Sequence, residues 1–363
     1  MGRHATPRGH RARADRRRPR RRRGLRVLGW TTAFLVLLGG TGTALVVHRL
    51  SGNVKSVDID ATLGGNRPQT SGTGAMNILL LGSDSRSNAG ESAKGGDPGR
   101  SDTTMVLHVY QDHRRAALVS IPRDTMVTRP ACTTPSGGKD PGGPREMFNA
   151  SFTVGGPACT VSTVERMSGL RMDHYLELDF NGFKKVVDAL GGVDITLTRP
   201  LKDRASGIDL KAGRHHVDGE RSLALVRTRS AVGDGGDLGR IQLQQAFLKA
   251  LLAQVGSAGT LGNPARLLAV ADTATKAMTT DSKLAGATAL VRLASDLKGL
   301  DSSKLQALTL PVRPYPQDVN RVQPMEAESR RLWDALRADQ PVPESVKERS
   351  MGDKGSAGGV IAP

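Results

Sequence analysis

The sequence predicts an α/β domain that follows a single transmembrane helix. Leu28 to Val47 is a run of twenty residues without a charged side chain. Downstream, short apolar or alternating runs have the pattern of β-strands, and segments of helical spacing dominate the second half of the chain. With 363 residues and 37% hydrophobic content, the chain can bury a substantial core.

The apolar run is long enough to cross a hydrocarbon core of about 30 Å. No convincing small-x-small cleavage site follows it, which argues against a cleaved signal peptide, and a buried core helix is the other alternative. Residues 1–27 carry twelve Arg and one acid, Asp15. Because a positive flank stays cytoplasmic, we expect residues 1–27 to be a cytoplasmic tail, residues 28–47 to span the cytoplasmic membrane and the following domain to lie outside.

The high net charge does not indicate a nucleic-acid-binding domain. Residues 1–27 contribute +11 of the net +17, so the rest of the chain is only mildly basic. Aromatic residues make up 3% of the chain, which leaves little material for base stacking. The tail could contact nucleic acid or anionic lipid, but a topology signal explains it, and we expect no nucleic-acid partner.

The outer part of the chain divides into a stalk, a domain and a tail. Residues 48–75 are polar and glycine-rich and predict a stalk. Strands are expected at 77–82, 103–110 and 116–121, then a strand, helix and strand over 173–197. Further helices are expected at 219–228, 238–255, 264–278 and 283–297. The domain then covers residues 76–338, and residues 339–363 are charged and rich in Pro and Gly, which predicts a disordered tail.

The two cysteines, Cys132 and Cys159, both lie in the outer part of the chain and flank a segment rich in Gly and Pro. In an oxidising compartment, an even pair favours a disulfide. Two unrelated thiols are the alternative. A metal site would need more ligands than these residues supply, since no His lies nearby.

Arg and Asp recur at the ends of the first three predicted strands, where open α/β sheets place ligands. An Arg fork suits a phosphate, and paired carboxylates suit Mg²⁺. No serine-nucleophile, zinc-protease or P-loop motif is present. The residues in question are Asp84, Arg86, Arg100, Asp102, Arg123 and Asp124.

A stronger signal lies in the helix that begins near Asp237. At about 100° per residue, Asp237, Arg240 and Gln244 fall on the side that Ile241 and the leucines define as buried, whereas Gln242 points away. Buried charges need partners or ligands, so the pattern predicts an anion site at the first turns of this helix. Arg227 and Arg229 lie just upstream and could close the same site. A purely structural Arg–Asp network is the alternative.

Several motifs in order resemble the LytR-CpsA-Psr family of bacterial cell-wall glycopolymer ligases. The resemblance covers roughly Met76 to Pro311. The motifs are NILLLGSDSR, RSDTTMVLHV, SIPRDTMV, FNASFTVGG, DFNGFKKVVDALGGVDI and VDGERSLALVRTR followed by DLGRIQLQQAFL.

The resemblance implies a mixed central β-sheet flanked by helices, with an apolar cavity for a polyprenyl tail and an arginine-lined mouth for its pyrophosphate. It implies transfer of a glycopolymer from a polyprenyl-pyrophosphate carrier to a peptidoglycan hydroxyl, with Mg²⁺. Asp84 and Asp102 match the magnesium carboxylates. The residues that match the pyrophosphate clamp are Arg123, Arg227, Arg229, Arg240 and Gln244. Further motif positions with less defined roles are Arg86, Arg100, Asp124, Asn149 and Asp237.

Two departures from the family pattern stand out. Leu243 occupies a position where the family often has Arg, and a glycine-rich linker separates VRTR from DLGR. Neither changes the clamp residues. The competing interpretations are a non-catalytic polyprenyl-pyrophosphate-binding protein or pyrophosphate hydrolase on the same fold, and a membrane-tethered transcriptional regulator. Within the ligase interpretation, Asp102 or Asp237 would accept the proton of the acceptor hydroxyl.

Overall fold

The computed structural model describes residues 52–65, 67–84, 101–229, 237–256, 264–350 and 360–362. The predicted cytoplasmic tail at 1–27 and the predicted membrane span at 28–47 lie outside these ranges, as do Arg86 and Arg100. Within the described ranges, no helix combines the length and the apolar character needed to cross a bilayer.

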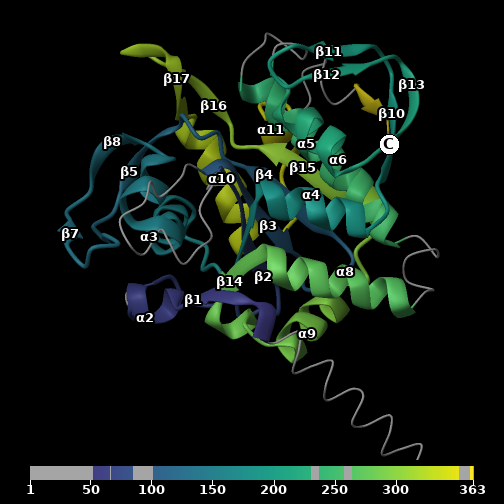
Figure 1. The fold of residues 1–363 in the computed structure, drawn as a ribbon. Coiled ribbons are helices and arrows are strands. Elements are labelled where there is room, and N and C mark those ends of the chain that lie inside the picture. Colours follow the sequence, from purple (N-terminus) through teal and green to yellow (C-terminus); the bar gives the residue numbers. More distant parts are fainter. Residues whose placement is uncertain are drawn as a thin grey trace, which may run out of the picture. The chain divides into compact units, whose positions relative to one another are not determined.

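A mixed sheet runs through the domain, and helices cover both of its faces (Figure 1). Parallel pairs join β1 to β14, β9 to β2 and β4 to β15, and the other neighbours are antiparallel. This confirms the α/β part of the predicted fold class, a mixed central sheet flanked by helices. In spatial order, the strands described are β1 (Lys55–Val57), β14 (Met278–Asp281), β9 (His174–Asp179), β2 (Met76–Ser83), β3 (Ser101–Val109), β4 (Ala116–Ser120) and β15 (Leu305–Thr309).

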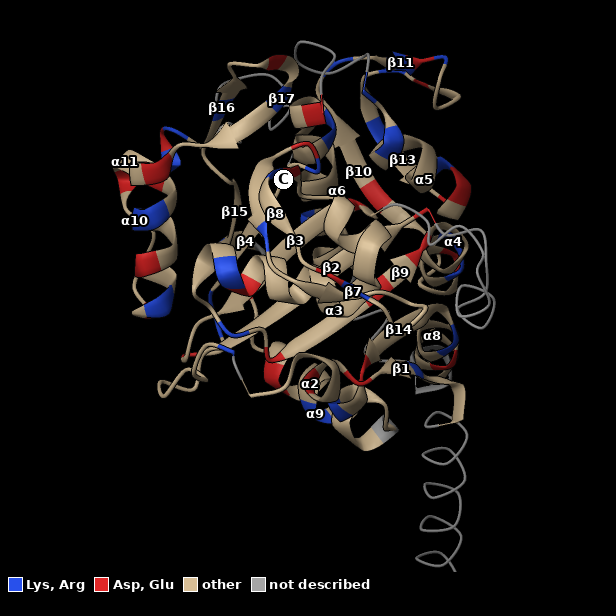
Figure 2. Ribbon diagram, turned by 90° about the vertical axis from the view of Figure 1, so that its left-hand side faces the viewer, with Lys and Arg blue, Asp and Glu red and all other residues tan. Residues whose placement is uncertain are grey.

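The strands are buried on both faces, and their side chains alternate between two separate cores. On one face, Leu79, Val106 and Val119 pack against helices α3 (Ala150–Ser168) and α10 (Glu326–Arg337). α10 turns its charged residues outward, as Figure 2 shows. On the other face, Leu80 and Met105 contribute to smaller clusters that include residues of α6 (Asp237–Gly256) and α9 (Ala287–Leu297).

A second, three-stranded sheet packs on the far side of α6. It consists of β13 (Gly213–Val217), β10 (Val193–Leu197) and β18 (Ile361–Ala362). The sequence predicted the strand at 193–197 correctly as a strand, but β10 does not join the central sheet. Its core also receives side chains from α4 (Phe180–Ala189), α5 (Gly219–Arg227) and the hairpin of β11 (Leu201–Asp203) and β12 (Ile208–Leu210).

The remaining elements are short or peripheral. Two-stranded ribbons are formed by β5 (Met126–Arg129) with β8 (Gly143–Met147), β6 (Cys132–Thr133) with β7 (Lys139–Asp140), and β16 (Val312–Tyr315) with β17 (Asp318–Pro324). The other helices are α2 (Ile59–Leu63), α8 (Pro264–Ala277), α11 (Glu344–Lys347) and the 3₁₀ turns η2 (Ser282–Leu284) and η3 (Ser302–Lys304).

The predicted domain boundaries are too narrow. Residues 52–75 are not a free stalk, because β1 pairs with β14 and Ile59 is buried in the core. Residues 339–350 are not a disordered tail either. Val342 and Val346 are buried, and the Ser350 hydroxyl exchanges hydrogen bonds with the backbone of Thr309. Polar and glycine-rich composition hid the few apolar side chains that anchor both segments.

Cys132 and Cys159 form a disulfide that ties β6 to α3, with their Cα atoms 5.4 Å apart. α3 is kinked beside this bond, at Gly155 and Gly156. A side chain at Gly155 would meet the Cβ of Cys159 at 2.6 Å, so this position needs glycine for the helix to approach the disulfide.

Candidate active site

A cavity of about 520 Å³ lies between the α6 face of the central sheet and helices α4, α5 and α6. Its body is apolar and its mouth is charged. The apolar lining includes Leu80, Met105, Leu178, Phe183, Phe247, Leu248 and Leu251. The polar lining includes Asp102, Asp203, Ser206, Arg227, Arg229, Arg240 and Gln244.

A β-bulge directs Asp102 toward the mouth. Gly82 pairs with Thr103 and Ser83 pairs with Ser101, so Asp102 has no partner on β2. Bulges of this kind bend a strand and re-aim a side chain. The Asp102 carboxylate accepts a hydrogen bond from Arg123 Nη1 at 2.5 Å, and its backbone carbonyl accepts one from Arg240 Nη2 at 3.0 Å.

Asp237, at the start of α6, lies between two of the arginines. Arg240 Nη2 is 2.5 Å from Asp237 Oδ1, and Arg123 Nε is 3.6 Å from the same oxygen. Arg123 Nε also lies 3.4 Å from Asp124 Oδ2. The anion site predicted at the first turns of this helix is therefore a cluster of alternating charges, and Arg240 within it is only 2% exposed.

The charges of this cluster are neighbours, but their hydrogen bonding is incomplete. Among the described residues, most of the buried polar side-chain atoms without a hydrogen-bond partner lie here. They are Arg123 Nε, both carboxylate oxygens of Asp237, Arg240 Nε and Gln244 Oε1. Buried polar atoms without partners are costly, so a concentration of them beside a cavity marks a place for a polar ligand.

Burial shifts the pKa values of two of these groups in the direction that favours the neutral form. Desolvation raises the pKa of Asp237, although the charges of Arg240, Arg123 and Arg229 act in the opposite direction. Desolvation likewise lowers the pKa of Arg240, with Asp237 opposing and Arg229 and Arg123 adding to the effect. Such shifts cluster at functional sites, where a ligand supplies the missing stabilisation.

The end of α5 and the residues just after it supply the next two arginines, Arg227 and Arg229. Gly219 lets α5 approach α4 closely, because a Cβ there would meet the carbonyl oxygen of Lys184 at 2.3 Å. The Arg227 guanidinium lies over the ring of Phe180, with Cζ 4.9 Å from its centroid. Gln244 Nε2 donates to the carbonyl oxygen of Val226 at 3.1 Å, which fixes α6 against this end of α5.

The structure brings most of the predicted site residues together. Those at or beside the mouth are Asp102, Arg123, Asp124, Arg227, Arg229, Asp237, Arg240 and Gln244. Asp84 follows the end of β2 and does not line the cavity. Asn149 also lies outside the cavity lining, and its backbone amide donates to the carbonyl oxygen of Arg123.

The sequence was wrong about the orientation of some side chains on α6. Gln242 was expected to point away from the protein, yet it is 8% exposed, and Gln245 donates to Ser120 Oγ and the carbonyl oxygen of Leu308. The helix is packed between both sheets, so it has no solvent face along this stretch. Leu243, which stands where the family often has Arg, is fully buried in the second core.

Asp203 and Ser206 were missed as site residues. Both belong to the β11–β12 hairpin, both line the cavity, and Asp203 is 4% exposed. In the sequence they stand in LKDRASG, which has the composition of an ordinary surface turn. No local signal distinguishes a turn that folds over a cavity from one that does not.

Two carboxylates at the strand ends are the residues that could hold Mg²⁺. Asp84 follows Ser83 and Asp102 follows Ser101, and Ser83 pairs with Ser101, so both carboxylates lie at one end of the β2–β3 pair. The described residues contain no cluster of three or more His, Cys, Asp or Glu that could hold a metal by themselves. Mg²⁺ needs only one or two carboxylates when waters and phosphate oxygens complete its shell.

Comparison with known proteins gives consistent matches. The model of the LytR_cpsA_psr family matches residues 46–338. The chain is 40% identical over 215 residues to the probable cell wall biosynthesis protein LcpB of Corynebacterium glutamicum, covering 57% of this chain and 48% of that protein. It is 30% identical over 253 residues to the polyisoprenyl-teichoic acid–peptidoglycan teichoic acid transferase TagT of Bacillus subtilis, covering 66% of this chain and 73% of that protein.

Among solved structures, the crystal structure of Bacillus subtilis TagV aligns with a TM-score of 0.57 and 26% identity. This alignment covers 76% of the present chain and 97% of TagV. The chain spans about half the length of the Corynebacterium relative, with 48% of it covered.

Proposed function

Because the chain belongs to the LytR_cpsA_psr family, we propose that it transfers a glycopolymer from a polyprenyl-pyrophosphate carrier to a hydroxyl of peptidoglycan. The observation that carries the proposal is the two-part cavity, in which an apolar body opens into a mouth lined by arginines. A carrier with a hydrocarbon tail and a pyrophosphate head has the same two-part chemistry.

The apolar body fits the hydrocarbon part of the carrier. Its volume of about 520 Å³ falls within the range of small-molecule sites, which bury most of a ligand against apolar side chains. Residues from the sheet, α4 and α6 line it together, so the tail would be held by rigid elements rather than by loops.

The mouth fits the pyrophosphate. Arg227, Arg229 and Arg240 line it, and Arg123 joins the same charge cluster through Asp102 and Asp237. Guanidinium groups bind phosphate oxygens bidentately, and partial burial strengthens these contacts. A bound pyrophosphate would also supply acceptors for Arg123 Nε and Arg240 Nε, which now have no hydrogen-bond partner among the described residues.

Phosphoryl transfer at this mouth requires positioning and charge neutralisation rather than a protein nucleophile. The acceptor oxygen forms a bond to the sugar-side phosphorus, the bond from that phosphorus to the bridging oxygen breaks, and polyprenyl phosphate leaves with the electron pair. The proton of the acceptor hydroxyl passes to a carboxylate. Asp102, which lines the cavity, and Asp237, whose pKa is raised by burial, are the candidates.

Mg²⁺ is the cofactor that we propose, with Asp84 and Asp102 as the residues that would hold it. When bound, the ion would neutralise charge that develops on the phosphate oxygens. Asp102 is ion-paired with Arg123 in this structure. To bind the ion, the Asp102 carboxylate therefore has to turn away from Arg123, or bind the ion while it keeps its contact with Arg123.

The proposed location is the outer surface of the cytoplasmic membrane, with the N-terminus inside. The predicted span at 28–47 and its Arg-rich flank support this location, as does the Cys132–Cys159 disulfide, since disulfides persist in oxidising compartments. Peptidoglycan and the lipid-linked glycopolymer are then both accessible to the domain.

A transfer assay tests the proposal. The full chain in detergent is mixed with a polyprenyl-pyrophosphate-linked oligosaccharide, a peptidoglycan fragment and Mg²⁺, and the products are identified by mass spectrometry. The expected product is the oligosaccharide joined to the fragment through a phosphodiester. Release of the oligosaccharide phosphate into water without transfer would identify a hydrolase, and an unchanged substrate that stays bound would identify a binding protein.

A further inference from the structure

We propose that Asp203 is a positioning residue that aims the Arg229 guanidinium at the pyrophosphate, and that the β11–β12 hairpin is the element that holds it. This inference rests on the proposed function, because it concerns the same mouth. Asp203 itself is not expected to react with the substrate.

Asp203 is tied to two segments of the chain through its carboxylate. Oδ1 accepts a hydrogen bond from the backbone amide of Ala205 at 2.9 Å, and Oδ2 accepts one from the backbone amide of Arg229 at 3.1 Å. The carboxylate is 4% exposed and lines the cavity. Hydrogen bonds to an ionised acceptor are among the stronger ones in proteins.

A second contact joins the hairpin to the residue before Arg229. Ser206 Oγ lies 2.9 Å from Thr228 Oγ1, and Thr228 Oγ1 donates to the carbonyl oxygen of Ala224 at 3.0 Å. Since a hydroxyl has one hydrogen, Thr228 uses its own for Ala224. Ser206 has two acceptors in reach, Thr228 Oγ1 and the carbonyl oxygen of Asp203 at 3.4 Å, and the shorter contact is the one to Thr228. Two side chains of one hairpin therefore fix two successive residues of the VRTR segment.

These contacts act at the place where helix geometry no longer fixes the chain. α5 ends at Arg227, and Thr228 has an extended conformation (φ −62°, ψ 133°). Arg229 lies beyond the helix, so its amide donates a hydrogen bond to Asp203 of the hairpin rather than to a carbonyl oxygen of the helix. Without that bond, the backbone that carries Arg229 would have more conformations available.

Packing in the second core holds the β11–β12 hairpin in place. Leu201 and Ile208, on its two strands, are buried in the second core together with Leu225 of α5. Figure 1 shows the hairpin next to α5. The positions of Asp203 and Arg229 are therefore set by one packed unit, and small displacements of a phosphate-binding group reduce transfer strongly.

A matched pair of substitutions tests the role. Asp203→Asn keeps the shape of the side chain but replaces one acceptor oxygen by an NH₂ group that cannot accept from an amide. Asp209→Asn is the control, because Asp209 lies on the same hairpin, is 64% exposed at its side chain and forms an ion pair with the exposed Lys202. We expect transfer by the full chain to fall about tenfold for Asp203→Asn and to stay at the wild-type level for Asp209→Asn.

A double-mutant cycle with Arg229→Ala separates positioning from folding. The alanine variant keeps the backbone amide that Asp203 binds but has no guanidinium to aim. If Asp203 acts through Arg229, adding Asp203→Asn to Arg229→Ala lowers transfer no further, whereas independent effects would add. Additive losses, or a tenfold loss matched by a fall in thermal midpoint that Asp209→Asn does not show, would overturn the inference.

The outcome also separates this inference from the proposed function. If the wild-type chain transfers no glycopolymer, the proposed function fails, and the cycle has no baseline. In that case the cycle is measured as affinity for inorganic pyrophosphate by calorimetry, with the same expectation of non-additivity. If the wild-type chain is active and Asp203→Asn matches Asp209→Asn, only the positioning role is wrong.

Discussion

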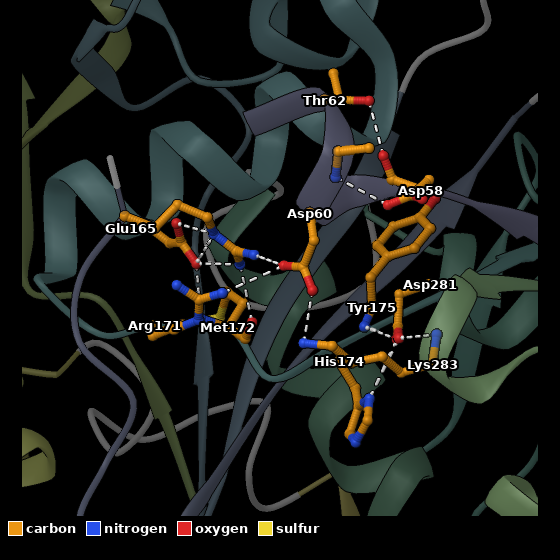
Figure 3. A network of polar contacts seen from close by, with 12 residues as sticks. Asp58, Asp60, Thr62, Glu165, Arg171, Met172, His174, Tyr175, Asp281 and Lys283 are labelled. Atoms are coloured by element: carbon orange, nitrogen blue, oxygen red, sulfur yellow. Dashed lines mark hydrogen bonds and ion pairs between the residues drawn. The ribbon is translucent and has the colours of Figure 1, made fainter. Parts of the chain in front are cut away.

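Two of the buried networks of Arg and acidic residues in the described part of the chain differ in how completely their atoms are paired. One is the charge cluster at the cavity mouth, formed by Asp102, Arg123, Asp237 and Arg240. The other surrounds Arg67 and involves α2, α3 and the β14–η2 segment. Figure 3 labels its members Asp60, Glu165, Arg171, Met172 and Lys283. We call the second one the Arg67 network.

The Arg67 network is closed. Arg67 Nε and Nη2 donate to Glu165, Nη2 also reaches the carbonyl oxygen of Met172, and Nη1 pairs with Asp60. Glu165 accepts a further bond from the amide of Met172. Asp60 also pairs with Arg171 and Lys283.

The charge cluster at the mouth contains the same residue types, but its hydrogen bonding is incomplete. Arg123, Arg240 and Asp237 have buried side-chain atoms without hydrogen-bond partners in the described part of the chain. No residue of the Arg67 network has such an atom. A fully paired network stabilises the fold. An incompletely paired one costs folding free energy, and a bound ligand can supply the missing partners. In these two networks, the satisfaction of buried atoms, more than the presence of Arg and Asp, is therefore what differs between the cavity mouth and the surroundings of Arg67.

The largest effect is expected for Arg227→Ala at the mouth. Loss of a guanidinium that neutralises the transferred phosphate should lower transfer by at least 10³-fold, about 4 kcal/mol, by analogy with arginine fingers. Arg227→Lys should rescue little, because an ammonium lacks the bidentate fork. The thermal midpoint should hardly change, since Arg227 is exposed. Parallel loss of transfer and folding would place Arg227 in a structural role.

Arg67→Ala should show the reverse pattern. Removing one partner of a buried pair leaves Glu165 uncompensated, so we expect the free energy of unfolding to fall by about 3 to 5 kcal/mol. Transfer per folded molecule, measured below the melting transition, should stay near the wild-type value. A variant that keeps its stability but loses transfer would show that the comparison between the two networks is wrong.

The disulfide provides a reference outside both networks. Replacing Cys132 and Cys159 together by Ser should lower the free energy of unfolding by about 3 kcal/mol through loop entropy, with little effect on transfer. Denaturant unfolding of the variant and of reduced wild-type protein should agree. Peptide mapping of protein exported by its host should find the two residues linked, and two free thiols there would contradict the prediction.

The smallest effect is a difference in pH dependence. The hydrogen bond from Lys283 and nearby positive charges lower the pKa of Asp60, so Asp60 contributes stability above pH 3.8 that is lost as pH falls through its folded pKa. Burial raises the pKa of Asp237, so its ionised form is unfavourable at neutral pH, and that penalty disappears as pH falls toward 3.8.

Denaturation of Asp60→Asn and Asp237→Asn between pH 6 and about 3 measures this difference. As pH falls, the stability advantage of the wild type over Asp60→Asn should shrink, by a few tenths of a kcal/mol because Asp60 is partly exposed. Relative to Asp237→Asn, the wild type should gain stability over the same range. Changes of the same sign for both variants would contradict the proposed contrast.

The sequence predicted much of the central sheet, because its strands are uninterrupted runs with clear turns between them. β2, β3, β4 and β9 lie within a residue or two of their predicted bounds. α3 was missed because Gly155, Gly156 and Pro157 break its helical pattern. The pairing of β1 with β14 and the separate sheet around β10 depend on contacts between distant segments, which local patterns do not encode.

The candidate site was predictable to the extent that charge and periodicity reveal it. The arginines at strand ends and the buried face of α6 identified most of the mouth. Asp203 was missed because its role depends on where the β11–β12 hairpin folds. The Arg67 network could not be predicted either, because nothing in the local sequence pattern around Arg67 or Glu165 indicates that these residues pair.

The central claim is that the cavity holds a lipid-linked pyrophosphate. The most direct measurement is mass spectrometry of the lipid that co-purifies with the full chain extracted from its host. We expect a polyprenyl pyrophosphate in the wild-type protein and a marked loss of it in Arg240→Lys, while Arg171→Lys, in the Arg67 network, retains it. Absence of any phosphate-bearing lipid from well-folded wild-type protein, or equal retention in both variants, would contradict the account.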